Sequence, residues 1–183
     1  MSSAVKGFTL IELIMTLSLA AILMSIAVPS YMTFSQNSKI TAQVNNLVTS
    51  INVARGEAAK RGTRVALCRS ANAGASSPSC GGSEYTWTGG WLVYAVGDNR
   101  TTPLYDSSKD VLIATGLSKG GVNIKTAGGA NKNLEFLPDG TTNEGGSTAY
   151  FAVCDERGAS KGRLVTVLPT GRPSTGNATD CTP

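Results

Sequence analysis

An almost unbroken apolar run from Phe8 to Val28 dominates the hydrophobic pattern of the chain. A helix of this length, about 21 residues, is roughly 30 Å long and matches the hydrocarbon core of a bilayer. The run contains one charged side chain, Glu12, whose burial in lipid would cost on the order of 3 kcal/mol. Such a group normally marks a function or has a partner. The pattern therefore predicts a membrane-spanning helix with a functional carboxylate near its start.

A second helical pattern follows the apolar run. Pro29 lacks an N–H and should kink or loosen the helix locally. Beyond it, apolar residues recur at three- and four-residue steps: Ile40, Val44, Leu47, Val48, Ile51, Ala54 and Ala58. This spacing predicts an amphipathic helix over residues 29–62 that packs on the rest of the chain and ends near Gly62.

Residues 63–183 show short strand patterns separated by turn signals. The candidate strands cover residues 63–68, 91–96, 111–115, 122–126, 133–137, 149–154 and 163–168. The turn signals include "PDG" from Pro138, where Asp139 is expected to be a turn residue, and "PTG" from Pro169. One long helix followed by short strands predicts an α+β fold in which the helix packs on an antiparallel β-sheet head.

The composition narrows the possible chemistry. The 183 residues include 21 glycines and no histidine, with a net charge of +4 and a hydrophobic content of 41%, which suits a globular head rather than a disordered one. No phosphate-cradling loop or G-x-S-x-G motif is present, and the carboxylates are spread over turns. We therefore expect no enzyme activity, no catalytic residues, no cofactor and no metal site. Trp87 and Trp91 are expected to pack in the core or against loops rather than to form a ligand platform.

The four cysteines, Cys68, Cys80, Cys154 and Cys181, contain no C-x-x-C pair. Without histidine, disulfides are favoured over a zinc site, and they indicate an oxidising compartment. Three connectivities are possible. The short loop between Cys68 and Cys80 is rich in Gly, Ser and Pro and has little else to hold it, which favours a Cys68–Cys80 bridge and hence a Cys154–Cys181 bridge. Buried free thiols are the less favoured alternative.

Three hypotheses address the N-terminus. A secretory signal peptide would have an A-x-A-like site at residues 25–27, but its basic region would hold only Lys6 and its apolar region would contain Glu12. A plain membrane anchor also leaves Glu12 unexplained. The third hypothesis is a processed anchor in which Glu12 finds a cationic partner.

The stretch "KGFTLIEL" resembles the prepilin signature of type IV pilins and type II secretion pseudopilins. This resemblance implies that residues 1–7 form a leader, that a membrane aspartyl peptidase cuts between Gly7 and Phe8, and that Phe8 is N-methylated. It also implies that Glu12 meets the N-terminal amine of a neighbouring subunit during assembly. A buried charge pair of this kind is better evidence for register than for stability.

The head resembles the GspH/FimT/FimU group. The matching stretches are "ARGEAAKRGTRVALCRS", "WTGGWLVY", "LEFLPDG" and "VTVLPTGRP", whereas residues 98–133 match nothing specific. The resemblance implies a type IV pilin-like fold with four segments: the leader 1–7, a transmembrane or filament-core helix 8–28, an amphipathic helix 29–62 and a β-rich head 63–183.

Three functions follow from this resemblance. The leading expectation is a FimU-like minor pilin in the tip or initiation complex that primes the type IV pilus. The alternatives are a FimT-like DNA-binding minor pilin for natural transformation and a GspH-type pseudopilin of type II secretion. The implied partners are other minor pilins, the major pilin, the prepilin peptidase and the inner membrane. The implied location is the inner membrane, with a periplasmic head, before assembly and the cell surface afterwards.

Two basic stretches, residues 55–69 and 157–172, raise the possibility of DNA contact. Arg163 and Arg172 are the candidate residues. However, "TGRPS" departs from the Gly-Arg-x-Arg motif of DNA-binding FimT proteins, because Ser174 stands where the second arginine would be. Weak or no binding to duplex DNA is therefore expected.

Overall fold

The computed structural model describes residues 7–82, 86–98, 104–118, 120–128, 133–143 and 145–181. Within these residues one helix precedes the strands of two sheets. The elements are α1 (Leu10–Arg61), β1 (Val65–Arg69), β2 (Trp91–Ala95), β3 (Val111–Gly116), β4 (Asn123–Gly128), β5 (Asn133–Phe136), β6 (Ala149–Cys154), β7 (Arg163–Val167) and β8 (Pro173–Asn177). The chain divides into two compact units, residues 1–38 and residues 39–183.

In the first unit, α1 remains helical through Pro29. Proline has no N–H, so the carbonyl of Ser25 lacks its usual donor four residues later. The hydroxyl of Thr33 donates to the carbonyl of Pro29 at 3.1 Å and adds a local bond within this turn. The helix continues beyond the proline to Arg61, so the missing N–H does not end it.

In the second unit, α1 buries the predicted apolar stripe. Its buried residues are Ile40, Gln43, Val44, Leu47, Ile51, Ala54 and Ala58. The helix ends as the sequence predicts: Gly62 adopts a φ of 64° and its N–H donates to the carbonyl of Ala58 at 3.0 Å. Glycine accepts this left-handed conformation without a steric penalty, so it terminates the helix and turns the chain into β1.

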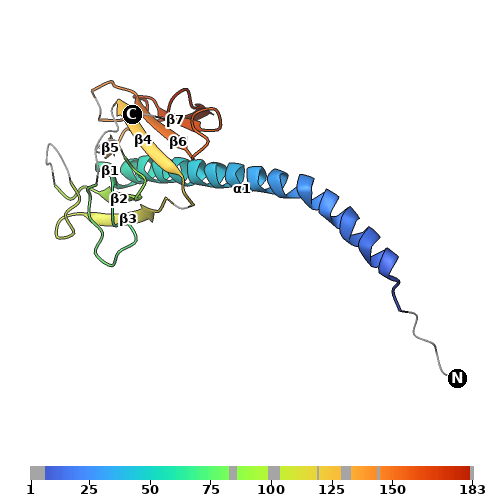
Figure 1. Ribbon diagram of the computed structural model, residues 1–183. Helices are drawn as coiled ribbons and strands as arrows, with labels where there is room; N and C mark the ends of the chain where they lie inside the picture. The colour runs from blue at the N-terminus through green and yellow to red at the C-terminus, as the bar shows by residue number, and fades with distance from the viewer. Residues whose placement is uncertain are drawn as a thin grey trace. The chain divides into compact units, whose positions relative to one another are not determined.

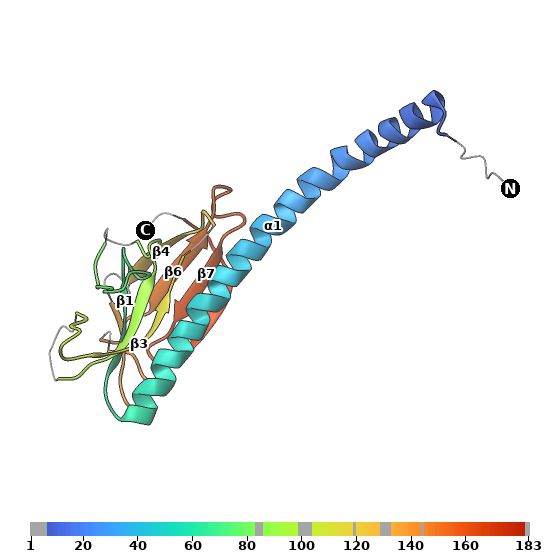
Figure 2. The same cartoon turned by 90° about the horizontal axis from the view of Figure 1, so that it is seen from below.

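The strands form two antiparallel four-stranded sheets, which confirms the predicted α+β fold with an antiparallel head; the sequence did not predict the division into two sheets. One sheet has the order β3-β2-β1-β5 and the other β4-β6-β7-β8. In Figure 1 the two sheets lie on opposite sides of the second half of α1, and in Figure 2 both lie on the same side of it. This part of the helix therefore lies in the angle between the two sheets, and residues from all three elements form one hydrophobic cluster.

The outer face of the first sheet carries a second, smaller hydrophobic cluster. Ala66, Cys68, Leu92 and Tyr94 from β1 and β2 contribute to it. Tyr105 packs on Tyr94 with ring centroids 5.3 Å apart. The loop after β1 lies over this face, so the sheet is covered on both sides, which explains why all five residues of β2 are buried.

The two disulfides join Cys68 to Cys80 and Cys154 to Cys181. These are the pairs that the sequence favoured. The first bridge fastens the loop after β1 to its own strand. The second joins the end of β6 to the residues that follow β8, and so fastens the C-terminal segment to its sheet.

Strand β8 was not predicted from the sequence. Its sequence, "PSTGN", has no apolar alternation, and four of its five residues are exposed. It pairs with β7 along its whole length, from Val167 opposite Pro173 to Arg163 opposite Asn177. Its main-chain ladder, rather than apolar burial, holds it in place, and periodicity cannot reveal such a strand.

Gly116 is required by the packing of Trp91, its cross-strand neighbour. A Cβ at Gly116 would lie 2.0 Å from the Cε2 atom of the Trp91 ring. Trp91 is fully buried in the main cluster, as is Trp87, which meets Phe151 edge-on at a centroid distance of 5.1 Å. The absence of a side chain at Gly116 therefore makes room for a core tryptophan.

Gly116→Ala should destabilise the head by about 1–3 kcal/mol, because Trp91 would have to leave its position in a close-packed core. Thermal unfolding of the full-length protein in detergent, followed by near-UV circular dichroism, would measure the loss. The matched control is Gly176→Ala on β8, where a new Cβ meets no atom within 4 Å. Equal melting temperatures for both variants would contradict the packing argument.

Candidate functional site

The first half of α1 exposes a long apolar surface. Every large apolar side chain from Phe8 to Phe34 is exposed, by 52% at Ile14 up to 84% at Phe8. Within the described residues, α1 is the helix whose length and composition would allow it to cross a membrane. So large an apolar surface is unfavourable in water, and it indicates a segment that contacts lipid or other protein chains.

The polar side chains of this segment are compatible with an apolar surrounding. Hydroxyls bond to main-chain carbonyls one turn earlier at Thr16, Ser18, Ser25 and Thr33, with distances from 2.7 to 3.1 Å. Their hydrogen-bonding capacity is thus met within the helix, as a bilayer requires. Glu12 remains as the one charged side chain between Phe8 and Ser38.

Thr9 caps the start of α1. Its carbonyl accepts from the N–H of Leu13 at 3.2 Å, and its hydroxyl oxygen accepts from the N–H of Glu12 at 3.3 Å. Thr9 therefore occupies the N-cap position and Glu12 the third helical position, and the bond from the Glu12 N–H to the Thr9 hydroxyl is one of the two bonds of a T-x-x-E capping box. This role of Thr9 was not predicted, although the four-residue motif is visible in the sequence.

The cap at Thr9 fixes the position of the Glu12 carboxylate in the first turn of α1. A carboxylate in the first turn interacts favourably with the partial positive charge at the helix N-terminus, which offsets part of its burial cost. The cap also defines where the helix begins, and thus the position of Glu12 relative to Phe8. Phe8 and Gly7 precede the helix and are exposed, so the bond that the prepilin resemblance assigns to the peptidase lies in non-helical, accessible chain.

Most candidate DNA-contacting cations between residues 55 and 69 already have protein partners. Arg55 donates to the carbonyl of Gly140 at 3.0 Å. Lys60 and Arg61 both pair with Glu57, at 3.3 and 2.6 Å. The hydrogen bonds from these two side chains lower the pKa of Glu57, and the bond from Arg61 has the larger effect. Several cations of the first basic stretch are therefore already engaged within the head, which reduces the charge available to a phosphate backbone.

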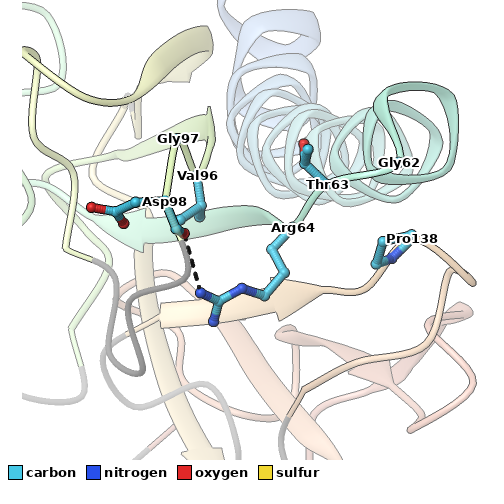
Figure 3. A pocket seen from close by; sticks show the side chains of 7 residues that line it. All are labelled: Gly62, Thr63, Arg64, Val96, Gly97, Asp98 and Pro138. Atoms are coloured by element: carbon cyan, nitrogen blue, oxygen red, sulfur yellow. Dashed lines mark hydrogen bonds between the residues drawn. The ribbon is translucent and has the colours of Figure 1, made fainter.

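Arg64 lines a surface pocket of about 410 Å³ at the end of α1 (Figure 3). Its guanidinium donates to the carbonyl of Asp98 at 3.4 Å and lies 3.4 Å from the buried carboxylate of Glu135. The remaining lining residues are Gly62, Thr63, Val96, Gly97 and Pro138. Arg64 therefore ties the end of α1 to β5, through Glu135, and to the segment after β2, through Asp98.

Two L-P-x-G turns lie side by side next to α1. In residues 137–140 and 168–171 the glycine N–H donates to the leucine carbonyl, at 2.8 Å in both turns. Arg55 bonds to Gly140, and a Cβ at Gly171 would lie 2.0 Å from the carbonyl oxygen of Gly140. The Arg55 guanidinium thus ties the first turn to α1, and the second turn packs closely on the first. The repeated L-P-x-G was the sequence signal for this pair.

The structure does not bring Arg163 and Arg172 together. Both are exposed. Arg163 begins β7 opposite Asn177, whereas Arg172 precedes Pro173 at the other end of the same strand pair. Five residue positions along a strand separate them, about 17 Å. A compact two-arginine phosphate site is therefore not formed.

Arg157 in the second basic stretch is also engaged. It forms a two-pronged ion pair with Asp155, with its Nη2 atom 2.7 Å and its Nε atom 2.9 Å from Oδ2. The hydrogen bond from the Arg157 side chain is the main cause that lowers the pKa of Asp155.

Asp139 is a turn residue, as the sequence suggested. Its carboxylate accepts hydrogen bonds from the hydroxyl and the N–H of Thr141, and these bonds lower its pKa.

The comparisons with known proteins agree with this architecture. The fold and the exposed apolar helix define a type IV pilin-like protein. The family model for type II transport protein GspH matches residues 43–171, and the prokaryotic N-terminal methylation motif matches residues 2–28. The chain belongs to the GspH family, and it is a pilin of the GspH/FimT/FimU type. No curated protein sequence matches the chain.

Crystal structures of the type IV minor pilin FimU from Pseudomonas aeruginosa strain PAO1, in two crystal forms, share the fold. The TM-scores are 0.57 and 0.58, at 15% and 16% sequence identity. The matched regions cover 78% and 81% of this chain and 99% of the FimU chain. At this identity the likeness establishes the fold and leaves the particular role to be proposed.

Thr9→Ala should weaken the start of α1 by about 1 kcal/mol, because the N–H of Glu12 would lose its acceptor. Amide hydrogen exchange of residues 10–13 in detergent micelles should become faster by about fivefold. Thr9→Ser, which keeps the hydroxyl, is the matched control and should exchange like the wild type. Identical exchange in all three proteins would show that Thr9 does not cap the helix.

Asp155→Asn should lower the free energy of unfolding by about 1 kcal/mol at neutral pH, because a charged hydrogen-bond partner of Arg157 is lost. Since folding lowers the pKa of Asp155, its stabilisation is present above the unfolded value of about 3.9 and is lost as the pH falls through the folded value. Denaturant unfolding of the full-length protein in detergent would measure this.

The difference in stability between wild type and Asp155→Asn should be constant from neutral pH to about pH 5 and shrink below about pH 4. Arg157→Gln should cause a similar loss at neutral pH, and the double variant should lose little more, because both changes remove one interaction. A difference that persists unchanged at pH 3, or full additivity of the two changes, would contradict this role of the pair.

Proposed function

We propose that the chain is a FimU-like minor pilin of the type IV pilus, which joins other minor pilins in the tip or initiation complex that primes pilus assembly. The observation that carries the proposal is the combination of two features in one chain. The N-terminus matches the methylation motif and exposes an apolar helix, and the head has the fold of FimU. The protein acts as a structural subunit and catalyses no reaction.

The N-terminal residues have the following proposed roles. Prepilin peptidase cleaves between Gly7 and Phe8, and the new amine of Phe8 is N-methylated. That amine is cationic at neutral pH and can pair with Glu12 of a neighbouring subunit. The pair offsets the burial of the carboxylate in an apolar filament core, and because only one register brings the two charges together, it aligns the incoming subunit.

The location follows from the same features. Before assembly the chain crosses the inner membrane once, with its head in the periplasm, where both disulfides can form. After assembly it lies at the cell surface in the pilus. Its partners are the prepilin peptidase, other minor pilins and the major pilin.

A pseudopilin of type II secretion is the second candidate, because the family model that matches the head is named for the type II transport protein GspH. Both functions use the same processing and the same helix. DNA binding of the FimT kind has less support, since Arg163 and Arg172 lie apart and several basic side chains pair within the head.

Deletion of the gene in its native host separates the two leading candidates. The pilus proposal expects loss of surface pili and of twitching motility, with secretion of type II substrates unchanged. Complementation with the wild-type gene should restore both pili and motility. Normal piliation together with failure of type II secretion would refute the pilus proposal in favour of the pseudopilin. Loss of DNA uptake alone would favour the FimT-like function.

Glu12→Val should leave membrane insertion intact and reduce incorporation into pili by about tenfold or more, because the neighbouring amine would lose its partner. Thr16→Val, another polar-to-apolar change in the same helix, is the control and should incorporate normally. Mass spectrometry of the mature protein should show a chain that begins at Phe8 with one added methyl group. Intact Met1, or normal incorporation of Glu12→Val, would contradict the proposed roles.

A further inference from the structure

Two of the four sheet edges are occupied by other parts of the head. At the edge of β5, Phe136 bridges to Thr142 and the N–H of Asn143 donates to the carbonyl of Glu135 at 3.0 Å. At the edge of β4, the N–H of Trp87 donates to the carbonyl of Ile124 at 2.8 Å. Within the described residues this leaves the outer edges of β3 and β8 available for pairing.

The hydrogen-bond pattern of β8 shows which main-chain groups face outward. Leu168 N–H donates to Arg172 C=O at 3.2 Å, and Ala178 N–H donates to Gly162 C=O at 3.1 Å. These two bonds flank the strand pair. Bonded and non-bonded residue pairs alternate in an antiparallel ladder. The even-numbered residues of β8 therefore bond to β7.

The odd-numbered residues of β8 consequently direct their main-chain groups away from β7. Thr175 and Asn177 each present an N–H and a C=O at this edge, and Pro173 presents a C=O. The missing N–H of Pro173 would point away from β7, so the ladder with β7 loses no hydrogen bond. Proline is tolerated in edge strands at such positions. The edge thus offers alternating donors and acceptors over one strand length.

A groove runs between this edge and α1. It has a volume of about 240 Å³ and is lined by Thr41, Val44, Asn45, Arg163, Thr175 and Gly176. Cross-strand partners share a face of the sheet, so Thr175 and Asn177 lie on the same face as Val165 and Arg163. Arg163 donates to the side-chain oxygen of Asn177. Among the lining residues that the structure describes, Arg163 contributes the charged group.

We propose that the β8 edge binds an extended acidic segment of another polypeptide as an added strand. The main chain of that segment would pair with Thr175 and Asn177. Alternate side chains would enter the groove, where a carboxylate would meet the Arg163 guanidinium, which has donors beyond the one used by Asn177. This is recognition by strand addition, with affinity from the ladder and specificity from the groove. It goes beyond the pilus assignment and does not depend on it.

The charge and chemistry of the edge favour this occupant over others. A phosphate backbone would accept from Arg163, but it would also face the carbonyls of Pro173, Thr175 and Asn177, which repel anions. A second copy of the chain, paired edge to edge, would bring two Arg163 grooves together. The outer edge of β3 also borders a groove, of about 360 Å³, lined by Thr115 of β3 and by Lys39 among others. Its pairing with β2 is interrupted by a bulge at Ile113, between the Val93–Ala114 and Tyr94–Leu112 pairs. A bulge twists an edge strand and breaks its regular alternation, so β3 is less suited than β8 to receive an added strand.

The test uses the full-length protein in detergent micelles and synthetic peptides of about eight residues, a strand length. One peptide alternates threonine and glutamate, and the other alternates threonine and lysine. Amide hydrogen exchange at Thr175 and Asn177 should slow about tenfold with the glutamate peptide, as a new ladder forms. The lysine peptide should bind about tenfold more weakly, because it places a cation beside Arg163.

Two variants test the two parts of the site. Thr175→Pro removes an outward N–H without removing a bond to β7, so it should abolish the added protection of Asn177 while the amides of β7 stay protected. Arg163→Gln should weaken glutamate-peptide binding about tenfold. Arg172→Gln, beyond the other end of β8, is the matched control and should bind like the wild type.

Several results would overturn the proposal. These are no protection of Asn177 at saturating glutamate peptide, equal binding of both peptides, or unchanged binding in Arg163→Gln. A short duplex DNA that protects the β8 edge in place of the peptide would assign the surface to nucleic acid. Concentration-dependent protection without any peptide would assign it to a second copy of the chain.

Discussion

One helical stripe supports the whole head. The buried residues of α1 from Ile40 to Ala58 face both sheets at once, and each sheet contributes its inner face to the same cluster. Neither sheet could bury that face without the helix, because an apolar sheet surface left open to water is unfavourable. Ala54 and Ala58, both fully buried, let the main chain of α1 approach the strands closely where the helix ends. The other half of α1 has no such cover, and its exposed apolar surface is left for lipid or neighbouring subunits.

The features that the sequence predicted are those with strong local signals. The three- and four-residue spacing from Ile40 onward predicted the buried face of α1, and Gly62 marked its end. The apolar strands were also found, because each has enough β-branched or aromatic residues to show its period. Strand β8 was missed because pairing with β7 stabilises it, and the division into two sheets was missed because strand order depends on contacts between distant residues. Such contacts leave no local periodicity.

At the functional site, the sequence identified the residue whose burial has a large energetic cost. It did not reveal the residues whose roles depend on hydrogen-bond geometry. Glu12 stands out because a charge in an apolar run requires an explanation. The capping role of Thr9 and the anchoring role of Arg55 involve ordinary residues, and only their hydrogen bonds reveal them. Arg163 and Arg172 were the two candidate DNA-contacting residues of the second basic stretch. The register of β7 and β8 places them at opposite ends of the hairpin, a distance that the sequence does not show.

The proposed binding of another chain at β8 requires that this strand is fixed in place while its outer edge stays exposed. The strand has little apolar contact, so its position relies on the β7 ladder and on the segment that follows it. There the Cys154–Cys181 bridge fastens the chain to β6. Gly162 packs closely against this bridge, since an added Cβ would lie 2.6 Å from the Cys154 sulfur. A strand held by its ends and one edge keeps its other edge accessible. The disulfide therefore links stability to function: it fixes an otherwise weak strand in a position where its free main-chain groups can be paired by another chain.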